Sequence, residues 1–236
     1  EGTQLGWLLD AIGGNDPNNP TACAVSGSGN GSSGTGDVNT QTATITLKPG
    51  DGVTCTFENT GNGATRTQGF WATHPQLALL AWNGGTGYNH TFPGVVNVSG
   101  IGDQTVCASL LNYNGTTIGK NINSLARLMG GFWSDISKTS TGSKRSNTDQ
   151  SRMQLLQQLL AAELNASAFG SVPSSGTFAS WESAYCSGNA QALQTAMQQA
   201  ASFNTQGDSS TFTPGTAADS KNARAVADIP FWNVLP

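Results

Sequence analysis

The hydrophobic pattern of this chain changes near residue 62, and this change constrains the fold more than any other feature. Before it, short runs rich in Thr, Val, Ile and Phe stand at 21–27, 42–48 and 52–59. In the second run Ile45 and Leu47 alternate with threonines, which is the period of a half-buried strand. "KPGDG" predicts a hairpin turn between the last two runs, and the Gly/Ser-rich stretch 26–36 predicts a flexible loop. Residues 1–62 therefore predict a β-rich domain.

After residue 62 the apolar residues recur at spacings of three and four, as in amphipathic helices. The strongest predicted helix spans 148–167, and its single apolar stripe leaves Gln157, Gln158 and Glu163 on the polar side. Further helices are predicted at 73–82, with Thr73 as N-cap and Pro75 in the first turn, and at 123–136, 178–186 and 189–203. Residues 63–236 thus predict a mainly helical domain, and the whole chain an α+β fold.

The chain has four cysteines, Cys23, Cys55, Cys107 and Cys186, which allow three possible disulfide pairings. The simplest pairing joins Cys23 to Cys55 in the β-rich domain and Cys107 to Cys186 in the helical domain, which would then be disulfide-braced. The alternative is four buried free thiols. An even number of cysteines in a sparsely charged chain favours an oxidising compartment.

Only 10% of the residues are charged, against about 25% in an average soluble domain, and the net charge is −4. Apart from "SKRS" at 143–146 the sequence has no Lys/Arg cluster, so nucleic acid is not an expected partner. No apolar run approaches the ~20 residues of a membrane span. The chain begins at Glu1 rather than Met, and we expect a processed, secreted protein whose export signal has been removed.

Two stretches resemble known bacterial sequences. Cys23, followed by "TLKPGDGVTCTFENT" at 46–60, resembles the final hairpin of prealbumin-like (transthyretin-like) domains in bacterial surface proteins. "TQGFWATHP" at 67–75 and "LLQQLLAAELN" at 155–165 resemble an uncharacterised secreted bacterial module. The resemblance implies an exported surface, matrix or fibre protein. It does not imply any enzymatic activity.

Immunoglobulin-like and prealbumin-like sandwiches use about seven strands over about 100 residues. This chain offers three clear strands and a doubtful fourth in 62 residues, so we expect a short, incomplete Ig-like β-sandwich. The helical domain or a strand from another copy would complete it. The apolar ends, 3–12 and 229–236, are the available donors. The inter-subunit anchors expected within them are Trp7, Leu8, Leu9, Phe231 and Trp232.

His74 is one of only two histidines and lies beside Trp71. A metal site needs about three protein ligands, and His90 is the only other histidine. A general base needs an orienting carboxylate, and none is near in the sequence. We therefore expect no catalytic residue, metal or cofactor here. Instead Phe70, Trp71, His74 and Pro75 should clasp the start of the helical domain, with His74 hydrogen-bonded near a helix start.

The other polar motifs in the sequence are weaker indications of a functional site. Carboxylates for polysaccharide hydrolysis would have to come from Asp103, Asp135, Glu163 and Glu182, and nothing in the sequence marks any of them. "NDPNN" at 15–19 predicts a turn rather than a calcium loop. N-x-S/T sequons occur at about the frequency expected by chance, at Asn30, Asn89, Asn97, Asn114 and Asn165. Core packing is expected for Trp71, Trp82, Trp133 and Trp181.

The favoured interpretation is a structural subunit of an extracellular bacterial filament or matrix fibre, a homopolymer formed by strand complementation or exchange of terminal segments. The alternative is a monomeric cell-surface adhesin or carbohydrate-binding module that uses exposed aromatic residues to bind surface glycans. A polysaccharide hydrolase is the third possibility, and the missing catalytic motifs argue against it.

Overall fold

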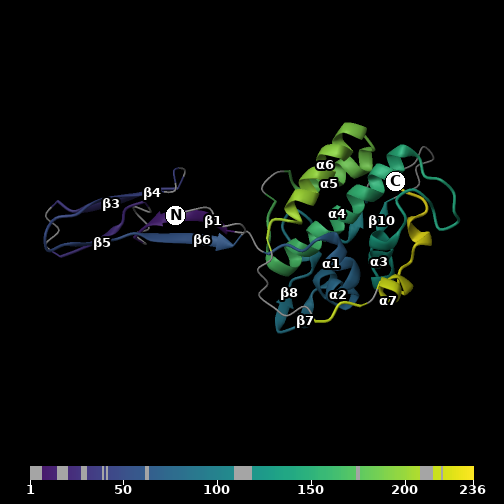
Figure 1. The fold of residues 1–236 in the computed structure, drawn as a ribbon, viewed down its shortest axis with the longest axis horizontal. Coiled ribbons are helices and arrows are strands. Elements are labelled where there is room, and N and C mark those ends of the chain that lie inside the picture. Colours follow the sequence, from purple (N-terminus) through teal and green to yellow (C-terminus); the bar gives the residue numbers. More distant parts are fainter. Residues whose placement is uncertain are drawn as a thin grey trace. The chain divides into compact units, whose positions relative to one another are not determined.

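The computed structural model describes residues 7–14, 21–27, 31–38, 40, 42–61, 64–108, 119–173, 176–207, 215–218 and 220–236. For residues 7–11 and 58–61 it describes the backbone alone. The chain divides into two compact units, an N-terminal unit of residues 1–62 and a helical unit of residues 63–236 (Figure 1). This division coincides with the boundary predicted from the change in hydrophobic pattern.

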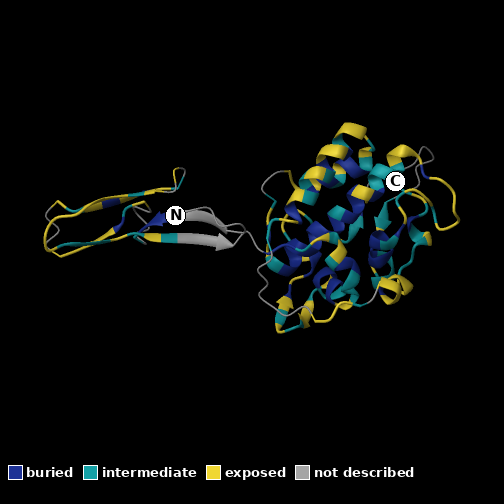
Figure 2. Ribbon diagram, in the orientation of Figure 1, coloured by how far each residue is buried: buried dark blue, intermediate teal, exposed yellow. Residues whose placement is uncertain are grey.

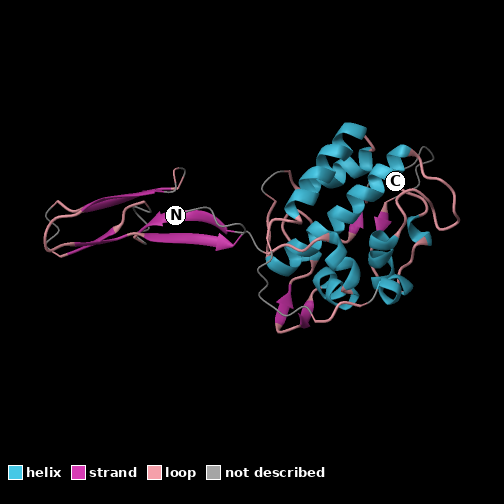
Figure 3. Cartoon of the chain, in the orientation of Figure 1, coloured by secondary structure: helices cyan, strands magenta, loops and turns pink. Residues whose placement is uncertain are grey.

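The N-terminal unit is built from short antiparallel strand pairs (Figure 3). Its strands are β1 (Trp7–Gly13), β2 (Ala24–Ser26), β3 (Ser33–Asp37), β4 (Thr42–Thr46), β5 (Gly52–Thr54) and β6 (Thr56–Gly61). The pairs are β1 with β6, β2 with β5 and β3 with β4. A single bridge between Ala22 and Thr35 joins the segment before β2 to β3. The runs predicted as strands contain β2, β4 and β5 and the first four residues of β6.

Strand β3 corrects the prediction of a flexible loop over 26–36. Its glycines are needed because the backbone approaches other groups closely. A Cβ at Gly34 would lie 2.6 Å from the Cβ of Cys23, and one at Gly36 would collide with Ile12. The disulfide between Cys23 and Cys55 lies beside β3. Among the described residues of this unit, only Ile12 and Cys23 are buried apolar side chains. Most of its described residues are exposed or intermediate (Figure 2).

The described part of the helical unit contains seven α-helices and two short strand pairs. Its helices are α1 (Gln68–Thr73), α2 (Pro75–Asn83), α3 (Leu125–Trp133), α4 (Asn147–Phe169), α5 (Phe178–Ser187), α6 (Ala190–Phe203) and α7 (Ser220–Ala225). The short strands are β7 (Gly85–Gly87), β8 (His90–Phe92), β9 (Thr105–Val106) and β10 (Lys120–Asn121), and the 3-10 turns are η1 (Val95–Asn97) and η2 (Pro230–Trp232). All five predicted helical regions contain helices.

The start of α2 differs from the prediction by one residue. His74 rather than Thr73 precedes the helix, and Pro75 is its first residue. The hydroxyl of Thr73 instead donates to the carbonyls of Gly69 and Phe70, each at 3.0 Å. Thr73 is thus the last residue of α1, a helix that the sequence pattern did not indicate.

Helix α4 is the centre of the unit and packs against α1, α2, α3, α5, α6 and η1. This burial on nearly all sides overturns the prediction of a polar side on α4. Gln157 is 9% exposed, and its Nε2 donates to the carbonyls of Phe132 and Ser134. Glu163 is 6% exposed. From Leu155 to Ala168 only Gln158 is not buried, so this part of α4 has no solvent-facing side, whereas Asn147 and Gln154 nearer its start are exposed.

Candidate functional site

The β3–β4 pair of the N-terminal unit has one inner face. Gly34 lies opposite Ile45, and Gly36 lies opposite Ala43. Residues directly opposite each other in an antiparallel pair share a face, so these four positions form one surface. Ile12 contacts this surface at Gly36, and the Cys23–Cys55 disulfide and Val53 contact it at Gly34. The inner face of the β3–β4 pair is therefore covered over β3.

The same face is uncovered over β4. Ile45 is 49% exposed, and Leu47, two residues farther along the same side, is 59% exposed. Both belong to the few large apolar side chains that the described chain leaves exposed. The inner face thus ends in two apolar side chains that no described residue covers.

Strand β4 also has an open edge. Among the described strands it pairs only with β3. Residues 42–47 carry no charge, and Lys48 is the first charged residue after them. Natural sheets usually protect an edge with charged side chains, proline or a bulge, and an uncharged edge of high β-propensity is a template for another strand. The open edge and the exposed Ile45 and Leu47 together define a candidate assembly site.

The predicted clasp lies within the helical unit. Trp71 is fully buried, and its Nε1 donates to Oδ1 of Asn165 at 2.9 Å. Nδ1 of His74 donates to the carbonyl of Phe70 at 2.8 Å, and the two rings stack with centroids 4.1 Å apart. Pro75 begins α2 directly after this turn. These contacts lie at the α1–α2 corner and include the predicted hydrogen bond of His74, and the clasp role of the four residues stays a prediction.

Asn165 is a residue whose importance the sequence did not indicate. It is fully buried, and its Nδ2 donates to the carbonyl of Arg66 at 2.9 Å and to Oδ1 of Asn204 at 2.8 Å. Its sequon is therefore inaccessible to a glycan. Nδ2 of Asn97 is engaged by the carbonyl of Pro93, whereas Asn89 lies exposed in the turn between β7 and β8. Asn30 and Asn114 lie outside the described residues.

The last segment of the chain corrects the prediction for Trp232. This indole is fully buried in its own unit, and its Nε1 donates to the carbonyl of Arg127 at 2.8 Å. It packs where Gly130 and Gly131 leave space on α3. Arg145 donates to the carbonyl of Trp232 at 2.9 Å. Trp232 is thus a core residue of its own unit rather than a surface anchor between copies.

The other predicted anchors differ in position. Phe231 is half-buried, with Lys120 and Arg127 lying over its ring at 4.8 and 4.4 Å. The side chains of Trp7, Leu8 and Leu9 lie outside the described residues, although their backbones pair with β6. The predicted turn at 15–19 also lies outside them.

Three of the four candidate carboxylates interact electrostatically with one another. Glu163 of α4 interacts electrostatically with Glu182 of α5 and with Asp103, which lies just before β9. Burial raises the pKa of Glu163 well above its ordinary value, and the charges of Glu182 and Asp103 raise it further. Burial also raises the pKa of Glu182, while the N–H of Cys107, 2.7 Å from Oε1, opposes that shift.

Asp135 lies in a separate turn after α3. Hydrogen bonds from the hydroxyl and N–H of Ser137 and from the N–H of Lys138 lower its pKa. A polysaccharide hydrolase would need substrate to reach an acid and a second carboxylate together, and Glu163 is only 6% exposed. The carboxyl arrangement therefore favours a buried ionisable group over a hydrolytic pair.

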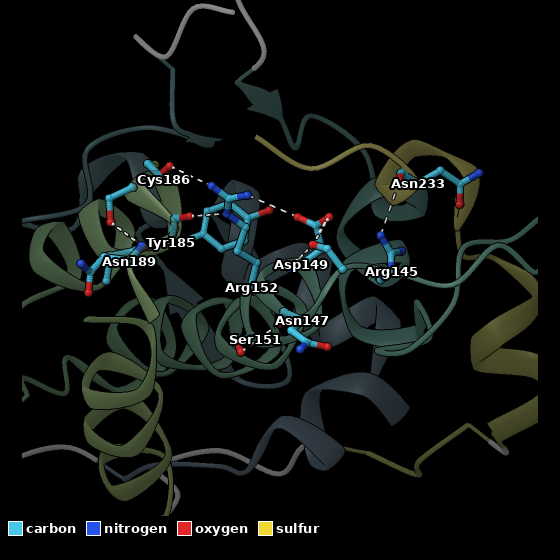
Figure 4. A network of polar contacts seen from close by, with 12 residues as sticks. Arg145, Asn147, Asp149, Ser151, Arg152, Tyr185, Cys186, Asn189 and Asn233 are labelled. Atoms are coloured by element: carbon cyan, nitrogen blue, oxygen red, sulfur yellow. Dashed lines mark hydrogen bonds and ion pairs between the residues drawn. The ribbon is translucent and has the colours of Figure 1, made fainter. Parts of the chain in front are cut away.

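Arg152 organises the contact between α4 and α5 (Figure 4). Its Nε donates to the carbonyl of Tyr185 at 2.9 Å, its Nη2 donates to the carbonyl of Cys186, and its Nη1 pairs with Asp149 at 3.3 Å. A cation at the carboxyl end of α5 suits the helix dipole. The same end of α5 is joined to Cys107 by the Cys107–Cys186 disulfide. These contacts brace the helical unit.

Neither a metal site nor a spanning helix is present in the described ranges. No group of three or more His, Cys, Asp and Glu side chains there is arranged to hold a metal ion. None of the described helices combines the length and the apolar character needed to cross a membrane. Comparison with known proteins found no matching family model, no matching curated protein and no matching solved structure.

Proposed function

We propose that this chain is a structural subunit of an extracellular bacterial filament or matrix fibre, in which copies join through the N-terminal unit. The observation that carries the proposal is the open, uncharged edge of β4 beside the exposed Ile45 and Leu47. A strand added at this edge would satisfy the free backbone groups and cover both side chains. The two disulfides are consistent with an extracellular location.

The donor in this proposal is β1 of the next copy. Among the described strands β1 pairs only with β6, so its second edge is open as well. Contact between two different edges is head-to-tail, and such a contact produces a filament when the rotation does not close a ring. Trp7, Leu8 and Leu9 of β1 would then be the inter-subunit anchors. The segment 229–236 is not the donor, because Trp232 fills the core of its own unit.

The N-terminal unit would then be the end of a prealbumin-like, Ig-like sandwich that a neighbouring copy completes. Among its described side chains only Ile12 and Cys23 are buried and apolar, which supports this proposal, because two-stranded pairs are marginally stable alone. The resemblance of 46–60 to a final prealbumin-like hairpin also supports it. The helical unit would decorate or pack the fibre.

The test introduces a lysine on the face of β4 that must be covered. We expect the wild-type protein to form filaments in negative-stain electron microscopy, and Ile45→Lys to be monomeric in sedimentation velocity. Thr44→Lys is the matched control, because it adds the same charge to the opposite, outer face of the strand. Filaments in the Ile45→Lys variant, or a wild-type protein that stays monomeric at high concentration, would overturn the proposal.

A carbohydrate-binding adhesin would use exposed aromatic rings, and the described tryptophans do not provide them. Trp71, Trp82, Trp181 and Trp232 are at most 2% exposed. Trp133 is half-buried, and its Nε1 donates to the carbonyl of Ala72. A titration of tryptophan fluorescence with glycans should give no saturable response, and a saturable response would favour the adhesin instead.

A further inference from the structure

Glu163 is a buried carboxyl without a compensating partner in the described part of the chain. It is 6% exposed, and no described group donates a hydrogen bond to its oxygens. Burying an ionised carboxylate without a cation or hydrogen-bond donors is strongly unfavourable, and such a group usually becomes neutral instead. The arrangement therefore raises the question of what neutralises this side chain.

The elements packed against α4 supply no positive charge to it. Helices α1, α2 and α6 and the turn η1 contain no titratable residue, and α3 contains only Arg127. Arg127 donates to the carbonyl of Asn121 and to Oδ1 of Asn123. Helix α5 presents Glu182, and the segment before β9 presents Asp103, so the nearby charges are negative. Tyr185 of α5 interacts with Arg145, Asp149 and Arg152 instead.

The rest of the chain offers no cation either. All ten Lys and Arg residues lie in the described ranges. Arg152 pairs with Asp149 and donates to two carbonyls of α5. Arg145 donates to the carbonyls of residues 135, 232 and 233. Arg66 lies over the rings of Phe70 and Phe169. No basic residue contributes to the electrostatic environment of Glu163 or Glu182. No Lys or Arg side chain therefore neutralises Glu163.

A proton fits this site better than a metal ion. The described residues offer no metal-binding group of three or more side chains. We propose that Glu163 is a proton-binding site that remains occupied at neutral pH, that the charge of Glu182 helps to retain the proton, and that the helical unit is consequently more stable in acid. The proton resides on a carboxyl oxygen of Glu163, and it dissociates to solvent when the unit unfolds.

The direction of the pH effect follows from the raised pKa of Glu163 in the folded chain. Below the ordinary carboxyl pKa of about 4.3 both states are protonated, and Glu163 contributes no pH dependence. Above it the unfolded chain ionises while the folded chain keeps the proton, so the free energy of unfolding falls as pH rises. The decline ends when pH passes the folded-state pKa.

The experiment measures Tm of the full chain between pH 5 and pH 8 for the wild type and for Glu163→Gln. Between the ordinary carboxyl pKa and the folded-state pKa of Glu163, one carboxyl of this kind lowers Tm by roughly 3–5 °C per pH unit for a unit of this size. We expect Glu163→Gln to lose this part of the decline. Asp135→Asn is the control, because an exposed carboxyl with a lowered pKa is ionised in both states above pH 5 and its removal should leave the slope unchanged.

Two further measurements keep the proposal falsifiable if Glu163→Gln does not fold. Glu182→Gln should raise Tm at pH 8 relative to the wild type, since the decline then ends at a lower pH. The infrared spectrum of the wild type at pH 7 should contain the carbonyl band of a protonated carboxylic acid. Absence of that band, or a slope in Glu163→Gln equal to that of the wild type, would overturn the proposal.

Discussion

Oδ1 of Asn165 accepts a hydrogen bond of 2.9 Å from Nε1 of Trp71, and both side chains are fully buried. The same oxygen accepts the N–H of Arg66 at 2.8 Å. Nδ2 of Asn165 reaches Asn204, which follows α6, and Asn204 in turn donates to Gln158. A single amide on the central helix thus holds the start of the helical unit, α1 and the end of α6 in one network.

Asn165→Leu should strongly destabilise the helical unit. The change leaves Trp71, Arg66 and Asn204 with buried polar groups that have lost their partner, and each such group costs about 1–3 kcal/mol. We expect a loss of at least about 3 kcal/mol, measured by urea unfolding. Asn147→Leu makes the same change at an exposed position of α4 and should alter stability by about 0.5 kcal/mol or less. Equal effects of the two changes would contradict the network.

Gly130→Ala should loosen the segment that carries Trp232. A Cβ at position 130 would collide with the carbonyl oxygen of Asp228 and lie 2.9 Å from Cδ1 of Trp232. Overpacking of this kind costs about 1–3 kcal/mol, and limited proteolysis should cleave near residue 228 faster than in the wild type. Gly69→Ala, at an exposed position of α1, meets nothing closer than 3.9 Å and should be neutral or slightly stabilising. An unchanged cleavage rate in Gly130→Ala would show that the segment adapts.

Tyr185→Phe should cost little or be stabilising. The tyrosine is fully buried, and its hydroxyl has no hydrogen-bond partner among the described residues. Removing an unsatisfied hydroxyl removes its desolvation penalty. Ser171→Ala is the comparison, because that buried hydroxyl donates to the carbonyl of Ala64 at 2.7 Å and its loss should cost about 1 kcal/mol. A loss of Tm in Tyr185→Phe as large as in Ser171→Ala would reveal a bound water or ligand at the hydroxyl.

Much of the fold follows from local patterns that the sequence displays directly. The alternation around Ile45 predicted β4, and the leucine spacing around Leu156 predicted α4. The positions of the cysteines predicted both disulfides. In each case the information lies within one element or in a simple count, so no knowledge of the tertiary structure is needed.

The remainder depends on residues that are distant in the sequence. The Asn165–Trp71 bond joins positions 94 residues apart, and Trp232 reaches the carbonyl of Arg127 across 105 residues. The sequence pattern predicts a polar face for Glu163, because periodicity reveals one stripe of a helix and not how many neighbours surround it. The sequence pattern predicts a loop in place of β3, because glycine normally weakens strands, whereas here only glycine allows the close approach of Ile12.

The two disulfides should have unequal effects on their units. In the N-terminal unit Ile12 and Cys23 are the only buried apolar side chains described, whereas the helical unit has a large core. The Cys23–Cys55 bond closes a separation of 32 residues, which stabilises a fold by roughly 3–4 kcal/mol in the loop-entropy model. That contribution is comparable to the stability that a single hydrophobic core supplies to a unit of 62 residues.

In Cys23→Ala/Cys55→Ala we therefore expect β3 and β4 to lose amide protection in hydrogen exchange while the helices remain protected. In Cys107→Ala/Cys186→Ala the helical unit should lose about 2–5 kcal/mol yet stay folded, since its core does not depend on the bond. The exchange should be measured on dilute protein, where a neighbouring strand cannot protect β4. Protection of β4 that persists in the first variant at high dilution would mean that the N-terminal unit is stable alone, and its exposed edge would then need no partner for folding.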